Sequence, residues 1–387
     1  MKIVVAPDSF KGTFTAQQAA VAMAQGCAQV VPGSDIVLKP MADGGEGSLD
    51  AVLSATPAEP VSIQTVDSYG RPISAIYGWH DRTAWIELAQ TCGLHFFADA
   101  PSASDSKNQW ALRASTWGAG VQWHHAIARG AQQIFFMIGG SGTTDGGFGL
   151  LGALGAHYWY QETLLSGDDA RQLALPIRIE NIDAVRELLE PTTVVVATDV
   201  TNPLCGSQGA SAVYGPQKGL SPEGVHQRDQ ELKRFGILLA QAAGARDTSV
   251  MFEEGMGAAG GTAFPLRLLA RNLRLVRGAE LIAESIGLEA AIAQADVVFT
   301  GEGATDAQTL AGKVPVSVLR LCRQYHKRCV VVSGHLGQGA EQLKTLGDVW
   351  LEQATPDGAS PLDIEQHGQQ WIAQAAARAL QFVMHGA

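Results

Sequence analysis

Short apolar runs followed by glycine-rich, acidic loops recur along the chain. Residues 2–6 and 36–38 each read as a buried strand that precedes apolar positions at helical spacing, and Thr15 is a candidate cap for the first helix. Buried strands followed by helical segments are expected again at residues 295–301, 328–334 and 347–352. Together these units would complete one doubly wound parallel sheet, built from both ends of the chain.

A different pattern fills the middle of the chain. Residues 61–88 contain alternating segments typical of strands with one exposed face. Apolar strands are expected at 134–138 and 193–198, and a long amphipathic helix at 222–243, whereas residues 160–190 are poorly patterned and read as a flap or excursion.

These patterns predict an α/β protein of two domains. The first is a discontinuous Rossmann-like domain with a doubly wound parallel sheet, residues 1–60 and 286–387. The second is an inserted mixed α/β domain, residues 61–285. A chain of 387 residues is also too long for one ordinary core.

The amino-acid composition limits the classes of molecule that the protein is expected to bind. Lys and Arg number 27 against 38 Asp and Glu, a net charge of −11 with no basic stripe, which argues against nucleic acid and anionic membranes. The five cysteines show no C-x-x-C spacing and read as buried thiols of a reducing compartment. The N-terminus resembles neither a signal peptide nor an anchor, so a cytoplasmic protein is expected. The sequence leaves a homodimer open.

Two loops near the N-terminus carry candidate chemistry. In PDSFKG, Asp8 is suited to a metal or a substrate hydroxyl and Lys11 to a phosphate or carboxylate; an exposed ion pair is the alternative. In ADGGEG, Asp43 and Glu46 stand among three glycines. Acidic residues at the start of a helix often only stabilise the helix dipole. Two acids and three glycines together at the carboxyl end of a strand instead favour a binding site.

The run QIFFMIGGSGTTDGG places a glycine loop directly after a buried strand. Gly140 permits a tight turn, Ser141 and Thr143 offer hydroxyls for phosphate or metal, and Asp145 adds the only charge. An ordinary strand-to-helix turn is the alternative. The loop has no Lys or Arg of its own, so a cation would have to come from elsewhere in the chain.

Three further loops add acids and a lysine. Asp199 in TDVTNPLCG stands where a general base or Mg²⁺ ligand would sit, and Asn202 precedes a proline as in a turn. The segment GEGATDAQTLAGKVP is not a Walker A loop; its candidate residues are Glu302, Asp306 and Lys313. No G-x-S-x-G nucleophile and no histidine metal pattern is present. The inventory of acids, lysines and glycine loops suits phosphoryl transfer.

GMGAAGG formally matches G-x-G-x-x-G, with Gly257 and Gly260 as its second and third glycines. The match is weak, because only a brief strand at 249–252 would precede it and two acids intervene. Anion binding at a glycine-rich helix N-terminus remains open.

Taken together and in order, the motifs PDSFKG, ADGGEG, IGGSGTTDGG, ATDVTNPLCG, YGPQKG, GMGAAGG and TGEGATDAQTLAGKVP resemble the bacterial glycerate kinases over nearly the whole chain. The resemblance implies ATP-dependent phosphorylation of D-glycerate, usually to 2-phosphoglycerate, with Mg²⁺. The chain departs from relatives at Trp117, Val121 and Ala304, which bear on substrate preference.

We therefore expect in-line phosphoryl transfer in an interdomain cleft, with D-glycerate and ATP as small-molecule partners. Asp199 is the expected base and Lys11 the second catalytic residue. The expected substrate-binding residues are Asp8, Asp43, Glu46, Asn202 and Lys313. The expected ATP-binding residues are Gly140, Ser141, Thr143, Asp145, Gly257 and Gly260. Glu302 and Asp306 are the expected metal ligands. The alternatives are a nicotinamide-dependent hydroxy-acid oxidoreductase and a non-catalytic hydroxy-acid-binding protein.

Overall fold

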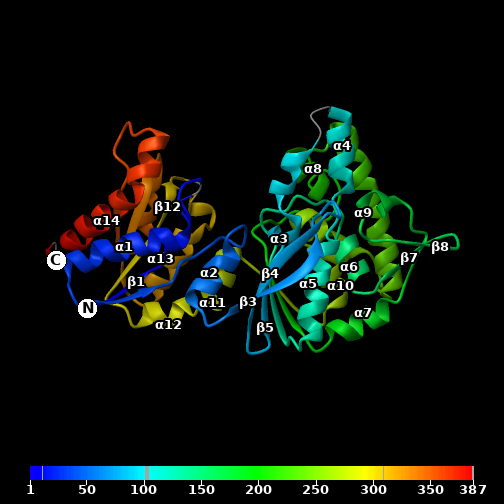
Figure 1. Cartoon of the computed structure of the whole chain (residues 1–387), viewed down its shortest axis with the longest axis horizontal. Helices are drawn as coiled ribbons and strands as arrows, with labels where there is room; N and C mark the ends of the chain where they lie inside the picture. The colour runs from blue at the N-terminus through cyan, green and yellow to red at the C-terminus, as the bar shows by residue number, and fades with distance from the viewer. Residues whose placement is uncertain (11, 101–103, 308, 386–387) are drawn as a thin grey trace. The chain divides into compact units, whose positions relative to one another are not determined.

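The computed structural model describes residues 1–10, 12–100, 104–307 and 309–385, which divide between two compact units (Figure 1). Unit 1 comprises Met1–Asp43, Asp50–Pro57 and Gly278–Ala387, and unit 2 comprises Gly44–Leu49 and Ala58–Arg277. The chain returns to unit 1 before residue 286, because helix α11 (Gly278–Ser285) packs against α12 (Leu288–Ala293) and α13 (Val314–Gln324) of that unit.

Unit 1 is built on a five-stranded parallel sheet in the order β14-β13-β12-β1-β2. Its strands are β1 (Lys2–Val5), β2 (Asp35–Leu38), β12 (Val297–Thr305), β13 (Arg328–Leu336) and β14 (Val349–Gln353). The strand order reverses between β1 and β12. In doubly wound sheets, ligands bind outside the carboxyl ends of the strands at this point.

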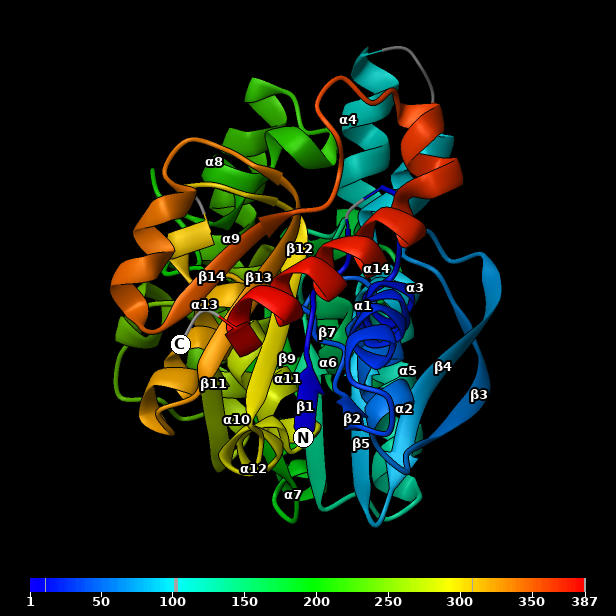
Figure 2. The ribbon, with the colours of Figure 1, turned by 90° about the vertical axis from the view of Figure 1, so that its left-hand side faces the viewer.

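Helices cover both faces of this sheet. Figure 2 shows α1 (Ala16–Val30) and α14 (Pro361–His385) crossing one face, where they pack against each other. Thr15 caps α1 through a capping box, as predicted. Successive strand residues point to opposite faces, so Ile3 joins the core under α1 and α14 while the equally buried Val4 faces the other side. The remaining helices of unit 1 are α2 (Ser48–Ala55), α11, α12 (Leu288–Ala293) and α13 (Val314–Gln324).

Unit 2 contains a six-stranded mixed sheet in the order β11-β10-β6-β5-β4-β3. Its strands are β3 (Glu59–Val66), β4 (Pro72–His80), β5 (Thr83–Glu87), β6 (Gln133–Met137), β10 (Thr193–Ala197) and β11 (Asn272–Val276). β5, β6, β10 and β11 are parallel, and β3 and β4 pair antiparallel at the edge. This architecture confirms the predicted α/β fold class with an inserted mixed domain.

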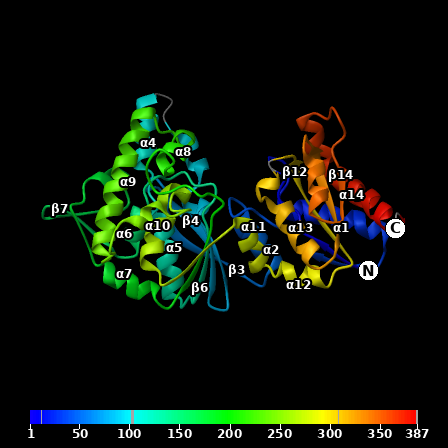
Figure 3. The ribbon, with the colours of Figure 1, turned by 180° about the vertical axis from the view of Figure 1, so that it is seen from behind.

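Helices and a small sheet surround the six strands (Figure 3). The helices are α3 (Ala89–Cys92), α4 (Ser104–Arg113), α5 (Trp117–Ala128), α6 (Phe148–Ala153), α7 (Ile182–Leu189), α8 (Ala210–Tyr214), α9 (Pro222–Ala242) and α10 (Ala263–Leu269). The small sheet contains β7 (His157–Tyr160), β8 (Thr163–Leu165) and β9 (Arg178–Glu180). The 3₁₀ helices η1 to η7 are Leu94–Asp99, Ala170–Ala174, Pro216–Lys218, Ser249–Phe252, Ala258–Gly261, Thr309–Ala311 and Ala340–Leu346.

Two expectations for unit 2 need correction. Residues 160–190 are not an unpatterned flap, because β8, β9 and α7 lie there and the buried Ile179 and Val185 join the main core. Residues 249–252 form η4 and not a strand. Both segments are short or polar, so their apolar positions are too few to show a period in the sequence.

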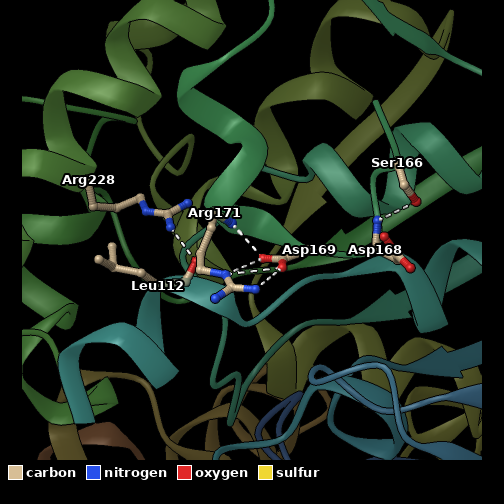
Figure 4. Close-up of polar contacts among 6 residues, drawn as sticks. All are labelled: Leu112, Ser166, Asp168, Asp169, Arg171 and Arg228. Atoms are coloured by element: carbon tan, nitrogen blue, oxygen red, sulfur yellow. Dashed lines mark hydrogen bonds and ion pairs between the residues drawn. The ribbon is translucent and has the colours of Figure 1, made fainter. Parts of the chain in front are cut away.

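A buried arginine ties the helices of unit 2 together. Arg228 of α9 has no exposed surface, and its guanidinium donates to the carbonyl of Leu112 at 2.5 Å (Figure 4). It also donates to the carbonyl of Ala170 at 3.2 Å. In the adjoining turn, Arg171 contacts the carboxylate of Asp169. Burial lowers the pKa of Arg228, and Glu231 at 3.2 Å opposes that shift. The side chain therefore acts as a structural tie between α9, α4 and η2.

The five cysteines are all buried and unpaired, as predicted. Among the described residues, none of the helices combines the length and apolar character that a membrane span requires.

Candidate functional site

In unit 1, the loop after β1 lies beside β12 at the point where the strand order reverses. The backbone N–H of Asp8 donates to the carbonyl of Gly301 at 2.8 Å, and the Asp8 carboxylate accepts the N–H of Ser9 at 2.6 Å. Asp8 is 4% exposed. A carboxylate is thus held at the carboxyl edge of the sheet, where ligands of this sheet type bind.

Glu302 extends from β12 into a set of hydroxyls and one cation. Its Oε1 accepts the hydroxyls of Thr309 at 2.7 Å and Thr305 at 3.3 Å, and its Oε2 lies 3.5 Å from Lys313 Nζ. Lys313 is the N-cap of α13, and Pro315 in the first turn favours that helix start. Glu302 is 5% exposed and the Lys313 side chain 38%, so the pair is open to solvent from the lysine side.

A cavity of about 500 Å³ opens over these residues within unit 1. Its charged lining residues are Asp8, Glu302, Lys313 and Asp357. Its apolar wall comprises Phe10, Phe14, Ile364 and Ile372. The volume lies in the range of small-molecule sites, which combine an apolar wall with a few converging polar groups.

The structure brings Asp8, Glu302 and Lys313 to one cavity, but it does not bring Asp306 there. Asp306 is absent from the residues that line the cavity, and its backbone N–H bonds the Thr309 hydroxyl at 3.2 Å. Asp306 follows the end of β12 while Glu302 lies within the strand, so the two side chains leave the backbone at different places. The expected catalytic Lys11 lies outside the described residues.

In unit 2, the glycine loop after β6 is organised around Asp145. Asp145 Oδ2 accepts the backbone N–H and the hydroxyl of Thr116, both at 2.8 Å, and the N–H of Gly149 at 3.1 Å. Oδ1 accepts the N–H of Gly147 at 3.1 Å. The residue has no exposed surface. This carboxylate holds the loop against the start of α5, and the expected ATP contact at Asp145 stays a prediction.

The other glycine motifs pack onto this loop. Gly146 N–H donates to the carbonyl of Gly260 at 2.9 Å, and Gly257 N–H donates to the carbonyl of Asn202 at 2.8 Å. A Cβ at Gly260 would lie 2.1 Å from the carbonyl oxygen of Thr143. GMGAAGG follows η4 instead of a strand, so it lacks the structural context of a dinucleotide fingerprint. These glycines serve close packing of backbone on backbone.

Four further residues of the expected site differ in their surroundings. The amide of Asn202 closes its own loop, donating to Gln208 O at 2.8 Å and accepting the Tyr214 hydroxyl at 2.7 Å. Asp199 is exposed directly after β10. Glu46 is also exposed, and Asp43 is half-buried. Of these four, Asp199 is the one that follows a central strand of the unit 2 sheet.

Sequence reasoning missed Glu87. It ends β5 and is 2% exposed, and its carboxylate accepts the backbone N–H groups of Leu49 at 2.8 Å and Gly47 at 3.4 Å. The same loop contacts the glycine loop, since Gly139 N–H donates to Gly44 O at 3.0 Å. The available signal was an acid at the end of the apolar run TAWIE.

Sequence reasoning also missed Lys218, although it stands in the quoted motif YGPQKG. Lys218 ends η3 and is 3% exposed, and its Nζ donates to Ser141 Oγ at 2.9 Å and to Thr143 O at 2.8 Å. Burial lowers the pKa of Lys218 to about 7, against the opposing effect of Asp145. This lysine supplies the cation that the glycine loop lacks in its own sequence.

Comparison with known proteins gives a consistent result. The glycerate kinase family model matches residues 3–384. The glycerate kinase of Haemophilus influenzae is 34% identical over 393 residues, covering 100% of both chains. The glycerate 2-kinase of Escherichia coli is 33% identical over 338 residues, covering 87% of this chain and 86% of that protein.

A solved structure shows the same architecture. A crystal structure described as a candidate glycerate kinase 2 from Salmonella typhimurium LT2 superposes with a TM-score of 0.86 at 34% identity, covering 100% of this chain and 99% of that one. The match of the family model across nearly the whole chain, together with this similarity of sequence and fold, means that the chain belongs to the glycerate kinase family.

Proposed function

We propose that the protein catalyses ATP-dependent phosphorylation of D-glycerate, with 2-phosphoglycerate as the product. Family membership supports the reaction class. The observation that carries the proposal is the unit 1 cavity, where Asp8, Glu302 and Lys313 meet at the reversal of strand order. Two carboxylates and one ammonium suit a small acid with hydroxyl groups and a transferring phosphate, because phosphoryl transfer depends mainly on positioning and charge neutralisation.

The residues of this cavity fit Mg²⁺. The described residues contain no group of three or more His, Cys, Asp or Glu side chains that could hold a metal by themselves. Magnesium usually takes one or two carboxylates and completes its shell with water and substrate phosphates. Asp8 and Glu302 supply two carboxylates on one cavity. When bound there, Mg²⁺ would neutralise charge on the transferring phosphate.

The side chains of the cavity have separable roles in this proposal. The hydroxyls of Thr305 and Thr309 fix one oxygen of Glu302 and leave the other toward Lys313. Lys313 neutralises a carboxylate or phosphate oxygen, since more than a third of its side chain is exposed. Asp8 orients a substrate hydroxyl or shares the metal. In unit 2, the exposed Asp199 is our proposed base for the attacking hydroxyl.

The glycine loop of unit 2 is proposed to contact the nucleotide phosphates through its outer part. Gly140 is exposed and Ser141 lies at the margin of burial, whereas Thr143 and Asp145 are buried behind them. The ligand contacts of this loop are therefore assigned to Gly140 and Ser141. Gly257, Gly260 and Asp145 maintain its shape.

A coupled assay of ADP release against D-glycerate, L-glycerate and related hydroxy acids tests the reaction. Phosphorus NMR of the product identifies the phosphorylated oxygen. We expect D-glycerate-dependent ADP release and a 2-phosphoglycerate signal. Binding of D-glycerate with no ADP release under MgATP would instead support a non-catalytic acid-binding protein, and a 3-phosphoglycerate signal would correct the product.

The metal assignment has its own test. Glu302→Gln removes the charge while keeping the side-chain volume, so the Mg²⁺ concentration for half-maximal activity should rise about tenfold or more, as for loss of one charged ligand. Glu341→Gln is the matched control, because Glu341 is exposed and its carboxylate pairs with Lys344 at the surface. An unchanged Mg²⁺ requirement in the Glu302 variant would exclude Glu302 as a ligand.

A further inference from the structure

Lys218 reaches into the glycine loop of unit 2 and contacts two of its oxygens. Its Nζ lies 2.9 Å from Ser141 Oγ and 2.8 Å from Thr143 O, and the residue is 3% exposed. Burying an ammonium is costly unless its protons are accepted. Both acceptors are neutral oxygens of one loop, so they offset only part of the free-energy cost of burying the ammonium. That placement requires a reason beyond packing.

The contact decides what the Ser141 hydroxyl can do. A serine hydroxyl has one proton and two lone pairs, whereas an ammonium can only donate. When Ser141 Oγ accepts an N–H of Lys218, which the ammonium and the neutral amine can both donate, the hydroxyl's own proton is left for another acceptor. Ser141 is followed in the loop by buried residues, but it is itself 9% exposed and follows the exposed Gly140. The hydroxyl is thus set as a donor at the outer part of the loop.

Two neighbouring hydroxyls of the loop are available to a ligand. Among the described residues, the buried Thr143 Oγ1 and Thr144 Oγ1 have no hydrogen-bond partner. Buried polar atoms without partners are uncommon and call for a water or ligand. The hydroxyls of the loop and the nitrogen of Lys218 that contacts it are therefore grouped at one place, which is a chemistry that favours an anionic oxygen.

We propose that Lys218 is a positioning residue that fixes the Ser141 hydroxyl as a hydrogen-bond donor to an anionic oxygen of a reactant. That oxygen belongs either to the carboxylate of the acceptor or to a phosphate of the nucleotide. The inference rests on the proposed kinase function and adds to it a residue and a mode of recognition. Lys218 acts through Ser141 and does not itself touch the ligand.

A double-mutant cycle tests the inference. Ser141→Ala, Lys218→Met and the double variant are compared by KM for D-glycerate, KM for MgATP and kcat, with the exposed Lys344→Met as a control. Each single variant should raise the same KM about tenfold, the effect of one charge-assisted hydrogen bond. Lys218→Met should add little in the Ser141→Ala background, because the two residues act in series. The affected KM identifies which reactant supplies the oxygen.

Other outcomes overturn the inference. If Lys218→Met lowers thermal stability and leaves both KM values unchanged, Lys218 is only a structural link between η3 and the loop. Additive effects of the two substitutions would likewise contradict action through Ser141. If Lys218→Met does not fold, Ser141→Ala and the hydroxyl-retaining Ser141→Thr remain decisive. Equal binding by these two variants and the unaltered protein would refute the donor role.

Failure of the kinase proposal can be told apart from failure of the inference about Lys218. If the unaltered protein releases no ADP, calorimetry with D-glycerate, ADP and inorganic phosphate still measures binding to each variant. A Ser141- and Lys218-dependent affinity for one of these probes would support the positioning role without the reaction. If both variants keep the affinity of the unaltered protein for every probe, the positioning role is refuted.

Discussion

Asp145 Oδ2 accepts both the backbone N–H and the hydroxyl of Thr116, each at 2.8 Å, inside unit 2. The hydroxyl of Thr116 in turn accepts the N–H of Leu150 at 2.9 Å. The contact joins the loop after β6 to the starts of α5 and α6, since the two glycine N–H groups also donate to Asp145. A single carboxylate therefore determines the shape of the glycine loop.

Asp145→Asn should lower the free energy of unfolding by about 3 kcal/mol, because an amide places a donor against N–H donors in a buried site. Urea denaturation measures this change. Asp183→Asn is the control, since that side chain is 86% exposed and should change stability by less than about 0.5 kcal/mol. If the Asp145 variant is as stable as the unaltered protein but has a raised KM for MgATP, the carboxylate contacts the ligand and does not mainly hold the loop.

Gly260→Ala should be more destabilising than Gly130→Ala. Both glycines have positive φ, +69° and +96°, so both substitutions incur strain of about 1–2 kcal/mol. Only at Gly260 would the new Cβ meet backbone, 2.1 Å from Thr143 O; at Gly130 nothing lies within 4 Å. We expect a further loss of about 2 kcal/mol at Gly260 from overpacking. Equal denaturation midpoints of the two variants would show that the loops around Gly260 and Thr143 can move apart without loss of stability.

Asp199→Asn should reduce kcat about 100-fold or more, the usual contribution of a general base. Its denaturation midpoint should stay near that of the unaltered protein, because Asp199 is exposed. Single-turnover ADP formation separates this loss from slow product release. A kcat near normal would exclude Asp199 as the base.

Stability should depend on the ionisation of Lys218. Its pKa is lowered by burial to about 7 in the folded protein, against about 10.4 in an unfolded chain. Between these values the unfolded state binds more protons, so this group makes the protein more stable as pH rises from about 7 to 10. The cost of burying its charge is fully present below pH 7.

The difference in unfolding free energy between the unaltered protein and Lys218→Met isolates this effect, since other titrating groups are shared. The difference should shift in favour of the unaltered protein by up to about 1.4 kcal/mol per pH unit over that interval. Urea denaturation at pH 6.5, 8 and 9.5 provides the measurement. A difference independent of pH would mean that Lys218 stays protonated when buried.

Much of the unit 1 architecture was predictable from sequence. Its strands are short apolar runs, and Thr15 carries a local capping signal. These signals depend on neighbours within a few residues, which a sequence displays directly. The same locality makes the candidate residues Asp8 and Glu302 visible in the sequence: Asp8 follows the apolar strand β1, Glu302 follows the apolar part of β12, and parallel strands place such residues at one edge.

Tertiary structure alone decided how the polar groups are used. Asp145 and Asn202 are attractive ligand-binding residues in sequence, yet their side-chain oxygens accept the hydroxyls of Thr116, 29 residues away, and Tyr214, 12 residues away. Lys218 is an unremarkable lysine in sequence, and only folding places it against Ser141, 77 residues away. Hydrogen-bond partners of buried groups are chosen by long-range packing, so residue type reveals the chemistry available but not the atom that receives it.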